Sequence, residues 1–191
     1  MLACIVKYHT TKIIKMKKTA ILTFALLFMT FIGQSQGLVD KDKFKVGFNA
    51  ALPIGDAADF SSFSLGLDVQ YHYGVSKVFD LGIATGFTNA FGKTETISDG
   101  TITIEADFDN VQFLPVAGAI RIFPTVRSRV SFGADLGYAV GISDGNDGGF
   151  YYRPTLAVNT GATTELTFSY TGISLDGGSW ETLTLGVLFG F

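Results

Sequence analysis

The sequence predicts an all-β fold, namely an eight-stranded antiparallel up-and-down transmembrane β-barrel. Polar and apolar residues alternate in eight segments of about ten residues, the length of a strand that crosses a membrane. The connections between these segments alternate between short and long, as they do in membrane barrels. Charged residues make up only 16% of the 191 residues, below the usual content of about a quarter.

Residues 1–36 are expected to be removed from the mature protein. From Met16, two lysines precede an apolar or Thr-bearing core over residues 20–32, and small polar residues follow. This order is typical of a secretory signal peptide, and the core is short for a membrane span of about 20 residues. We expect cleavage near Gln36, which leaves a barrel domain over residues 37–191. Residues 1–15 have no role upstream of such a signal, so Met16 is the expected initiator.

The expected mature chain contains no cysteine, because Cys4 is the only one in the sequence. Disulfides, thiol catalysis and cysteine metal sites are therefore excluded. The net charge of −3 argues against a nucleic-acid partner, which binds basic patches.

The first four segments cover residues 43–52, 63–75, 79–91 and 111–122. In the first segment, apolar residues occupy every second position from Phe44 onward. The second segment is the most regular, since apolar or aromatic residues alternate with polar residues or glycine along its whole length. The third sets Leu, Ile and Phe opposite small residues. The fourth is the least regular, because Pro115 cannot donate to the strand ladder and suggests a bulge.

The last four segments cover residues 130–142, 150–159, 164–173 and 181–191. The fifth sets apolar residues opposite Ser, Gly and Ala, and the sixth sets them opposite Arg and Thr. In the seventh, "TELTFSYTGI", alternation is nearly perfect from Leu166. The eighth ends in "LGVLFGF", in which Phe189 and Phe191 share the apolar face.

Short connections are expected at residues 76–78, 123–129 and 160–163, and longer ones after the first, third, fifth and seventh segments. Outer-membrane barrels have short periplasmic turns and longer external loops, so the alternation places both chain ends on the periplasmic side. The longest connection, residues 92–110, is expected to be a solvated acidic loop. Its acidic residues are Glu95, Asp99, Glu105, Asp107 and Asp109.

The apolar faces are expected to contact lipid, and the polar faces to fill the interior. The polar faces are rich in Gly, Ala, Ser and Thr, whereas a soluble surface would be rich in Lys and Glu. An eight-stranded barrel is just wide enough to be filled by side chains, so small residues leave room for a few long ones. About 11 residues at ~3.4 Å each, tilted by ~40°, rise roughly 28 Å, against an apolar band of about 25 Å.

Charged residues of both signs fall on the predicted inner faces. Buried charges are tolerated only when they are paired and hydrogen-bonded, and the basic and acidic groups nearly balance. We therefore expect a structural ionic network that plugs the interior. Its predicted members are Lys45, Asp68, Asp80, Arg121, Asp135, Arg153 and Glu165.

The signal peptide, the eight alternating segments and the terminal "LGVLFGF" together resemble the small outer-membrane β-barrel domain family, which includes the OmpA- and OmpX-like barrels. The resemblance spans the expected mature chain and is one of architecture and pattern. It implies an eight-stranded barrel in the outer membrane of a Gram-negative cell envelope, with Phe189 and Phe191 as the signal for the barrel-assembly machinery. No peptidoglycan-binding segment follows Phe191, so that activity of longer OmpA-like proteins is not expected.

Two groups of residues resemble sites of chemistry. His72 and Asp68 share a face, as a Ser/His/Asp arrangement would require, but no nucleophile motif accompanies them and a polar interior role is favoured. Asp144, Asn146 and Asp147 resemble the start of a calcium loop. The distant Glu of an EF-hand is missing, and an external turn rich in Gly and Asp explains them equally well.

The sequence therefore favours a non-enzymatic outer-membrane barrel with a structural or surface-interaction role, and without catalytic residues, metal ligands or a cofactor. A narrow pore or a carrier of a hydrophobic ligand is the alternative. A lipid-modifying membrane enzyme and a soluble secreted barrel are further alternatives. The expected partners are outer-membrane lipid, the barrel-assembly machinery and an extracellular ligand, but not nucleic acid. The extracellular ligand is expected at residues 53–62, 92–110, 143–149 and 175–180.

Overall fold

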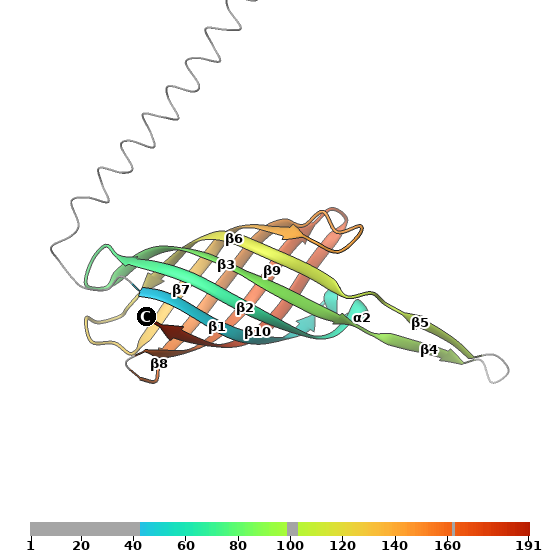
Figure 1. The fold of residues 1–191 in the computed structure, drawn as a ribbon, viewed down its shortest axis with the longest axis horizontal. Helices are drawn as coiled ribbons and strands as arrows, with labels where there is room; N and C mark the ends of the chain where they lie inside the picture. Colours follow the sequence, from blue (N-terminus) through green and yellow to red (C-terminus); the bar gives the residue numbers. More distant parts are fainter. Residues whose placement is uncertain (1–42, 99–102, 162) are drawn as a thin grey trace, which may run out of the picture. The chain divides into compact units, whose positions relative to one another are not determined.

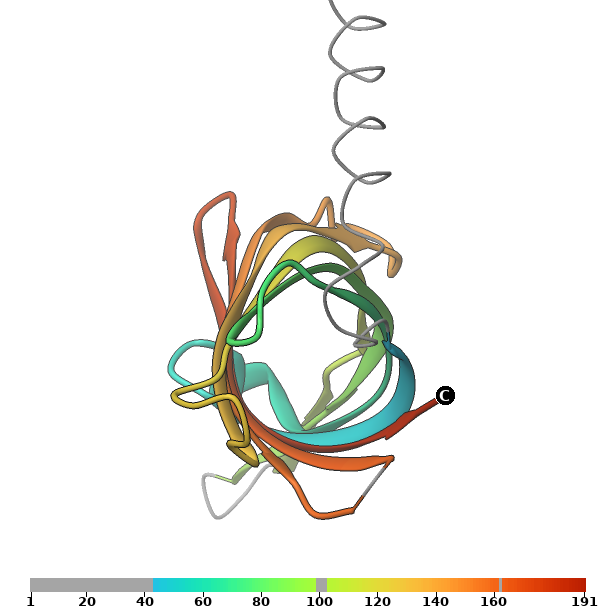
Figure 2. The same ribbon diagram turned by 90° about the vertical axis from the view of Figure 1, so that its left-hand side faces the viewer.

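A computed structural model describes residues 43–98, 103–161 and 163–191. The expected signal peptide lies outside these described residues, and so does Asp99. Eight strands close into an antiparallel barrel in the ring order β1-β10-β9-β8-β7-β6-β3-β2. Figure 1 shows the barrel from the side, and Figure 2 looks along it and shows the closed ring. The predicted fold class is confirmed.

The barrel strands are between 11 and 14 residues long. Strands that follow one another in the ring form antiparallel pairs, and β1 pairs with β10 from Lys45 opposite Gly190 to Ile54 opposite Glu181, so the barrel has no free edge. The strands are β1 (Lys43–Ile54), β2 (Ser61–Gly74), β3 (Phe79–Gly92), β6 (Val111–Ile122), β7 (Val130–Gly141), β8 (Gly149–Asn159), β9 (Thr164–Leu175) and β10 (Gly178–Gly190).

The two faces of each strand lie as predicted. Large apolar side chains point outward, and Ile83, Phe48 and Leu185 are 67%, 65% and 65% exposed. Polar and charged side chains point inward, and Asp135 is fully buried. This distribution is the inverse of that in a soluble protein, where apolar residues fill the inside.

The connection at residues 92–110 was predicted to be a plain loop, and this prediction is wrong. The connection contains a β-hairpin of β4 (Thr94–Ser98) and β5 (Thr103–Asp107). Its strands are rich in Thr and Ile, whose branched side chains favour extended backbone. The hairpin projects beyond the end of the barrel (Figure 1). At its base, the Phe108 N–H donates to Lys93 O at 2.9 Å, and Thr94 Oγ1 lies 2.7 Å from Asp107 Oδ1.

The connection predicted at residues 175–180 is shorter than expected. Strand β9 ends at Leu175 and β10 begins at Gly178, so only Asp176 and Gly177 link them. Gly177 has a φ of +96°, which glycine adopts without a steric penalty. Trp180, expected in a loop, is therefore part of β10.

Pro115 does not create the expected bulge. Strands β3 and β6 keep one register on both sides of it, from Thr85 opposite Val116 to Thr88 opposite Phe113, and only the pairing between these positions lapses. Thr85 Oγ1 donates to Pro115 O at 2.9 Å and compensates in part for the missing ladder bonds.

The first long connection contains one helical turn, α2 (Ala57–Phe60), whose Ala57 is fully buried. Lys93 lies beside this turn, since its N–H donates to Phe60 O at 3.0 Å and its Nζ donates to Ala58 O. In the part of the chain that the structure describes, no helix is long and apolar enough to cross a membrane.

Candidate functional site

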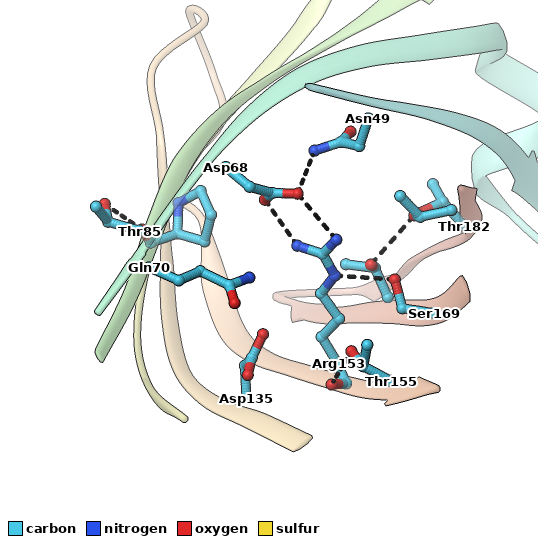
Figure 3. Close-up of polar contacts among 12 residues, drawn as sticks. Asn49, Asp68, Gln70, Thr85, Asp135, Arg153, Thr155, Ser169 and Thr182 are labelled. Atoms are coloured by element: carbon cyan, nitrogen blue, oxygen red, sulfur yellow. Dashed lines mark hydrogen bonds and ion pairs between the residues drawn. The ribbon is translucent and has the colours of Figure 1, made fainter. Parts of the chain in front are cut away.

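The centre of the barrel interior is occupied by an Arg153–Asp68 ion pair. Arg153 Nη1 lies 2.8 Å from Asp68 Oδ1, and Nη2 lies 3.0 Å from Oδ2, so the guanidinium binds the carboxylate in a bidentate manner. Arg153 comes from β8 and Asp68 from β2, which face each other across the ring (Figure 3). The pair therefore spans the interior from one wall to the other.

Neighbouring side chains complete the hydrogen bonding of this pair. Arg153 Nε donates to Ser169 Oγ at 2.9 Å, and Asn49 Nδ2 donates to Asp68 Oδ2 at 2.9 Å. Such bonds are needed because a buried ion loses its hydration shell, and Coulomb attraction repays that loss only in good geometry.

A second ion pair joins neighbouring strands. Arg121 Nη1 lies 2.7 Å from Asp135 Oδ1, and the side chains of the two residues are 3% and 0% exposed. Arg121 also donates to Ile120 O at 2.8 Å and to Gln70 Oε1 at 3.3 Å. The guanidinium is thus bound to both its own wall and the β2 wall.

A third pair lies toward the short turns of the barrel. Lys45 Nζ lies 2.8 Å from Glu165 Oε2, across the intervening strand β10. Both residues line a cavity of about 160 Å³ that His72, Asp80 and Asn159 also line. This end of the interior is therefore polar and has room for several water molecules.

The seven predicted interior residues are all buried, and the part of the chain that the structure describes contains the three ion pairs given above. Register also places Asp80 beside Arg121 and Asp135 beside Arg153. Around the ring, the signs alternate from Lys45 on β1 by way of β9, β8, β7 and β6 to Asp80 on β3, and β2 adds a second acidic residue, Asp68. Arg121 and Arg153 therefore each lie beside two carboxylates, one bound in an ion pair and one opposite in the strand register.

At the opposite end of the interior, a group of apolar side chains packs together; we call it the apolar stopper, defined as Ala57, Phe113, Tyr151, Ile173 and Trp180. They pack as one buried cluster, and the rings of Phe113 and Trp180 lie 5.7 Å apart. Only a cavity of about 30 Å³ separates this layer from the Arg153–Asp68 pair. Sequence analysis missed the stopper, although apolar residues at inner-face positions 113, 151 and 173 signal it.

His72 and Asp68 do not form a catalytic pair. The Asp68 carboxylate binds Arg153 and Asn49, whereas His72 has no hydrogen-bond partner among the described residues. In the turn that resembles a calcium loop, Asn146 Nδ2 donates to Gln112 O and its Oδ1 accepts from the Gly148 N–H. That side chain therefore stabilises the turn, and the described residues contain no cluster of His, Cys, Asp or Glu that could hold a metal ion.

The two residues of the predicted assembly signal lie on the outer surface. Phe189 is 42% exposed on β10, and Phe191 is 81% exposed. The Phe191 N–H donates to Phe44 O at 2.9 Å, which holds the end of the chain against β1.

Comparison with solved structures identifies the fold. A structure of the Yersinia pestis outer membrane protein Ail in a phospholipid bilayer nanodisc aligns with a TM-score of 0.51 and 18% identity, over 79% of this chain and 100% of that chain. A crystal structure of Ail from Yersinia pestis aligns with a TM-score of 0.51 and 16% identity, over 78% and 97% of the two chains. No family model matches the sequence, and no curated protein matches it. At this identity the likeness establishes the eight-stranded barrel fold.

Proposed function

We propose that this chain is an integral barrel of the cell outer membrane, with a closed interior and a structural or surface-interaction role. One observation carries this proposal: seven charged side chains of the strands lie inside the barrel, and most of the large apolar side chains lie outside. Such a surface is stable against lipid and unstable in water. Ail, which shares the fold, is named an outer membrane protein and was studied in a phospholipid bilayer.

The closed interior follows from three layers along the barrel. The apolar stopper fills one end, the Arg153–Asp68 pair crosses the middle, and the polar cavity beside Lys45 occupies the other end. An ion that passed through would have to displace both the stopper and an ion pair. These layers argue against a steady pore and against an internal hydrophobic ligand.

Surface interaction is assigned to the end that carries the long connections. There, α2, the β4–β5 hairpin and the connections at residues 142–148 and 176–177 extend past the barrel strands. External loops of membrane barrels are the part free to bind a partner outside the cell. Catalysis is not part of the proposal, because Asp68, Asp135 and Glu165 are engaged in ion pairs and His72 has no hydrogen-bond partner among the described residues.

Delivery to the membrane is proposed to depend on the two ends of the sequence. Residues 16–36 would direct export and then be removed. The exposed Phe189 and Phe191 on the last strand would be recognised by the barrel-assembly machinery.

Conductance in a planar bilayer tests the closed interior. The refolded protein is first shown to insert into lipid vesicles, by the shift in electrophoretic mobility between unheated and boiled samples. We expect inserted protein to give no steady current. A steady, ion-selective current would favour the narrow-pore alternative, and failure to insert, with full solubility in detergent-free buffer, would overturn the membrane assignment itself.

A further inference from the structure

The two ends of the barrel differ in charge. Outside the interior, the described short turns carry the basic residues Lys77, Arg127 and Arg129 and no acidic side chain. The connections at the other end carry mainly acidic residues, with Lys93 as their described basic residue. The asymmetry therefore lies along the barrel axis.

The three basic residues belong to neighbouring turns. Lys77 lies in the β2–β3 turn, and Arg127 and Arg129 lie in the β6–β7 connection. The two segments are joined by a hydrogen bond from the Phe123 N–H to Val78 O at 2.9 Å, and β3 pairs with β6. The third short connection, after β8, has no charged residue in its described part. The positive charge is thus confined to one side of the rim, which we call the basic rim.

Apolar residues surround these charges on the same turns. Val75 and Val78 are 44% and 38% exposed in the turn that carries Lys77, and Val126, in the turn that carries Arg127, is 59% exposed and also lines the polar cavity beside Lys45. Exposed valines beside Lys and Arg suit the boundary of a bilayer, where the valines contact acyl chains and the cations reach the headgroups.

We propose that the basic rim binds the phosphate groups of anionic phospholipids in the leaflet that faces the short turns. The inference rests on the proposed membrane location. Charge complementarity selects the partner, because Lys and Arg bind phosphate oxygens through charge-assisted hydrogen bonds and are attracted to anionic lipid surfaces. An acidic soluble protein would not account for the exposed valines among the charges.

Lipid retention tests the proposal. The protein is reconstituted in vesicles of phosphatidylcholine with a minor fraction of phosphatidylglycerol, extracted in mild detergent, and its bound lipids are counted by native mass spectrometry. The wild type should retain phosphatidylglycerol in excess of its share of the vesicle. The Lys77→Gln/Arg127→Gln/Arg129→Gln variant should lose this preference, by about five-fold for each basic residue near the surface, and added salt should weaken it in the wild type.

Two variants serve as controls. Asp144→Asn/Asp147→Asn/Asp176→Asn also removes three charges, of the opposite sign and at the other end, and should keep the preference. Arg127→Lys/Arg129→Lys keeps the charge and should retain most of it, which also covers the case in which the glutamine variant does not fold. If the wild type inserts but shows no preference for phosphatidylglycerol, or if the aspartate control loses the preference equally, the proposed lipid binding by the basic rim is wrong. The membrane location would still stand in either case. Failure of the wild type to insert would overturn the membrane location instead.

Discussion

Arg153 illustrates how single residues hold the interior together. Its Nε, Nη1 and Nη2 atoms each bind a different acceptor on β2 or β9, so one side chain links three strands. A lysine offers no planar fork and could not reproduce this geometry. The position therefore requires arginine for its shape as well as for its charge.

Removing Arg153 alone should lower the free energy of unfolding more than removing both members of the Arg153–Asp68 pair. Arg153→Ala leaves Asp68 buried with Asn49 as its side-chain donor, and we expect a loss of about 3–5 kcal/mol in the free energy of unfolding. Arg153→Met combined with Asp68→Leu removes both charges and should recover most of that loss. Urea unfolding in lipid vesicles, followed by electrophoretic mobility, measures both. Equal losses in the single and double variants would show that the pair is not desolvated.

The outer face can be tested at the same scale. Leu136 lies mid-strand on β7 and is 54% exposed, whereas Ile142 lies just past the end of β7 and is 48% exposed. Leu136→Arg should destabilise the protein by about 2–4 kcal/mol, because it places a cation at the bilayer midplane, and Ile142→Arg by about 0–1 kcal/mol. The same unfolding assay compares them. Similar costs at the two depths would mean that this face does not contact a bilayer.

At the scale of the strands, glycines set how closely neighbouring backbones approach. A Cβ added at Gly137 on β7 would lie 2.1 Å from Val116 O and 2.6 Å from Ala117 Cα on β6. A Cβ added at Gly118, on the same strand pair, would meet only Leu136 O at 3.9 Å. The first glycine is thus required by close packing of the backbone, and the second is not.

Alanine substitution should separate these two glycines. Gly137→Ala forces β6 and β7 apart, and we expect a loss of about 1–3 kcal/mol, the usual cost of overpacking. Gly118→Ala should be tolerated, since its new methyl group makes an ordinary contact. Unfolding curves of the two variants in vesicles decide the matter. A stable Gly137→Ala protein would contradict the close approach.

The sequence predicts the barrel strands well because lipid on one side and the narrow interior on the other both require polar and apolar residues to alternate. Lipid requires apolar residues on one face, as at Phe48, and the narrow interior requires small or paired polar residues on the other, as at Asn49. Past the strand ends neither requirement holds, so the pattern does not separate a loop from a hairpin. The β4–β5 hairpin and the tight turn at Gly177 were therefore missed, although the β-branched residues of "TETIS" and the "DG" pair are signals for them.

The interior residues could be assigned to a face from sequence, but their partners could not. Arg153 lies beside Asp135 in the strand register and yet binds Asp68 on the opposite wall. Which carboxylate a long side chain reaches depends on strand tilt and on the width of the ring, which alternation does not encode. The apolar stopper was missed because its parts come from separate strands and from α2, which meet only in the closed barrel.

At the scale of the whole molecule, the proposed role depends on which end of the barrel faces the cell exterior. Both chain ends of the described barrel lie at the same end as the β2–β3, β6–β7 and β8–β9 connections. The other end carries α2, the β4–β5 hairpin, the β7–β8 connection and the two-residue link between β9 and β10. Long loops reach the exterior in outer-membrane barrels because the chain is inserted from the periplasmic side, which favours the short turns staying behind. The acidic end should therefore be outside and the basic rim inside.

Single cysteines test this orientation on living cells. Cys4 is the only cysteine of the sequence, and replacing it with serine gives a cysteine-free background. Asp144→Cys and Asp176→Cys place a thiol on exposed positions at the end that carries α2 and the β4–β5 hairpin, and Thr125→Cys places one on an exposed position at the other end. A membrane-impermeant maleimide added to intact cells should label the first two and spare the third, whereas all three should react after the outer membrane is permeabilised. Labelling of Thr125→Cys alone on intact cells would place the basic rim outside and would reverse the assignment of the surface-interaction end.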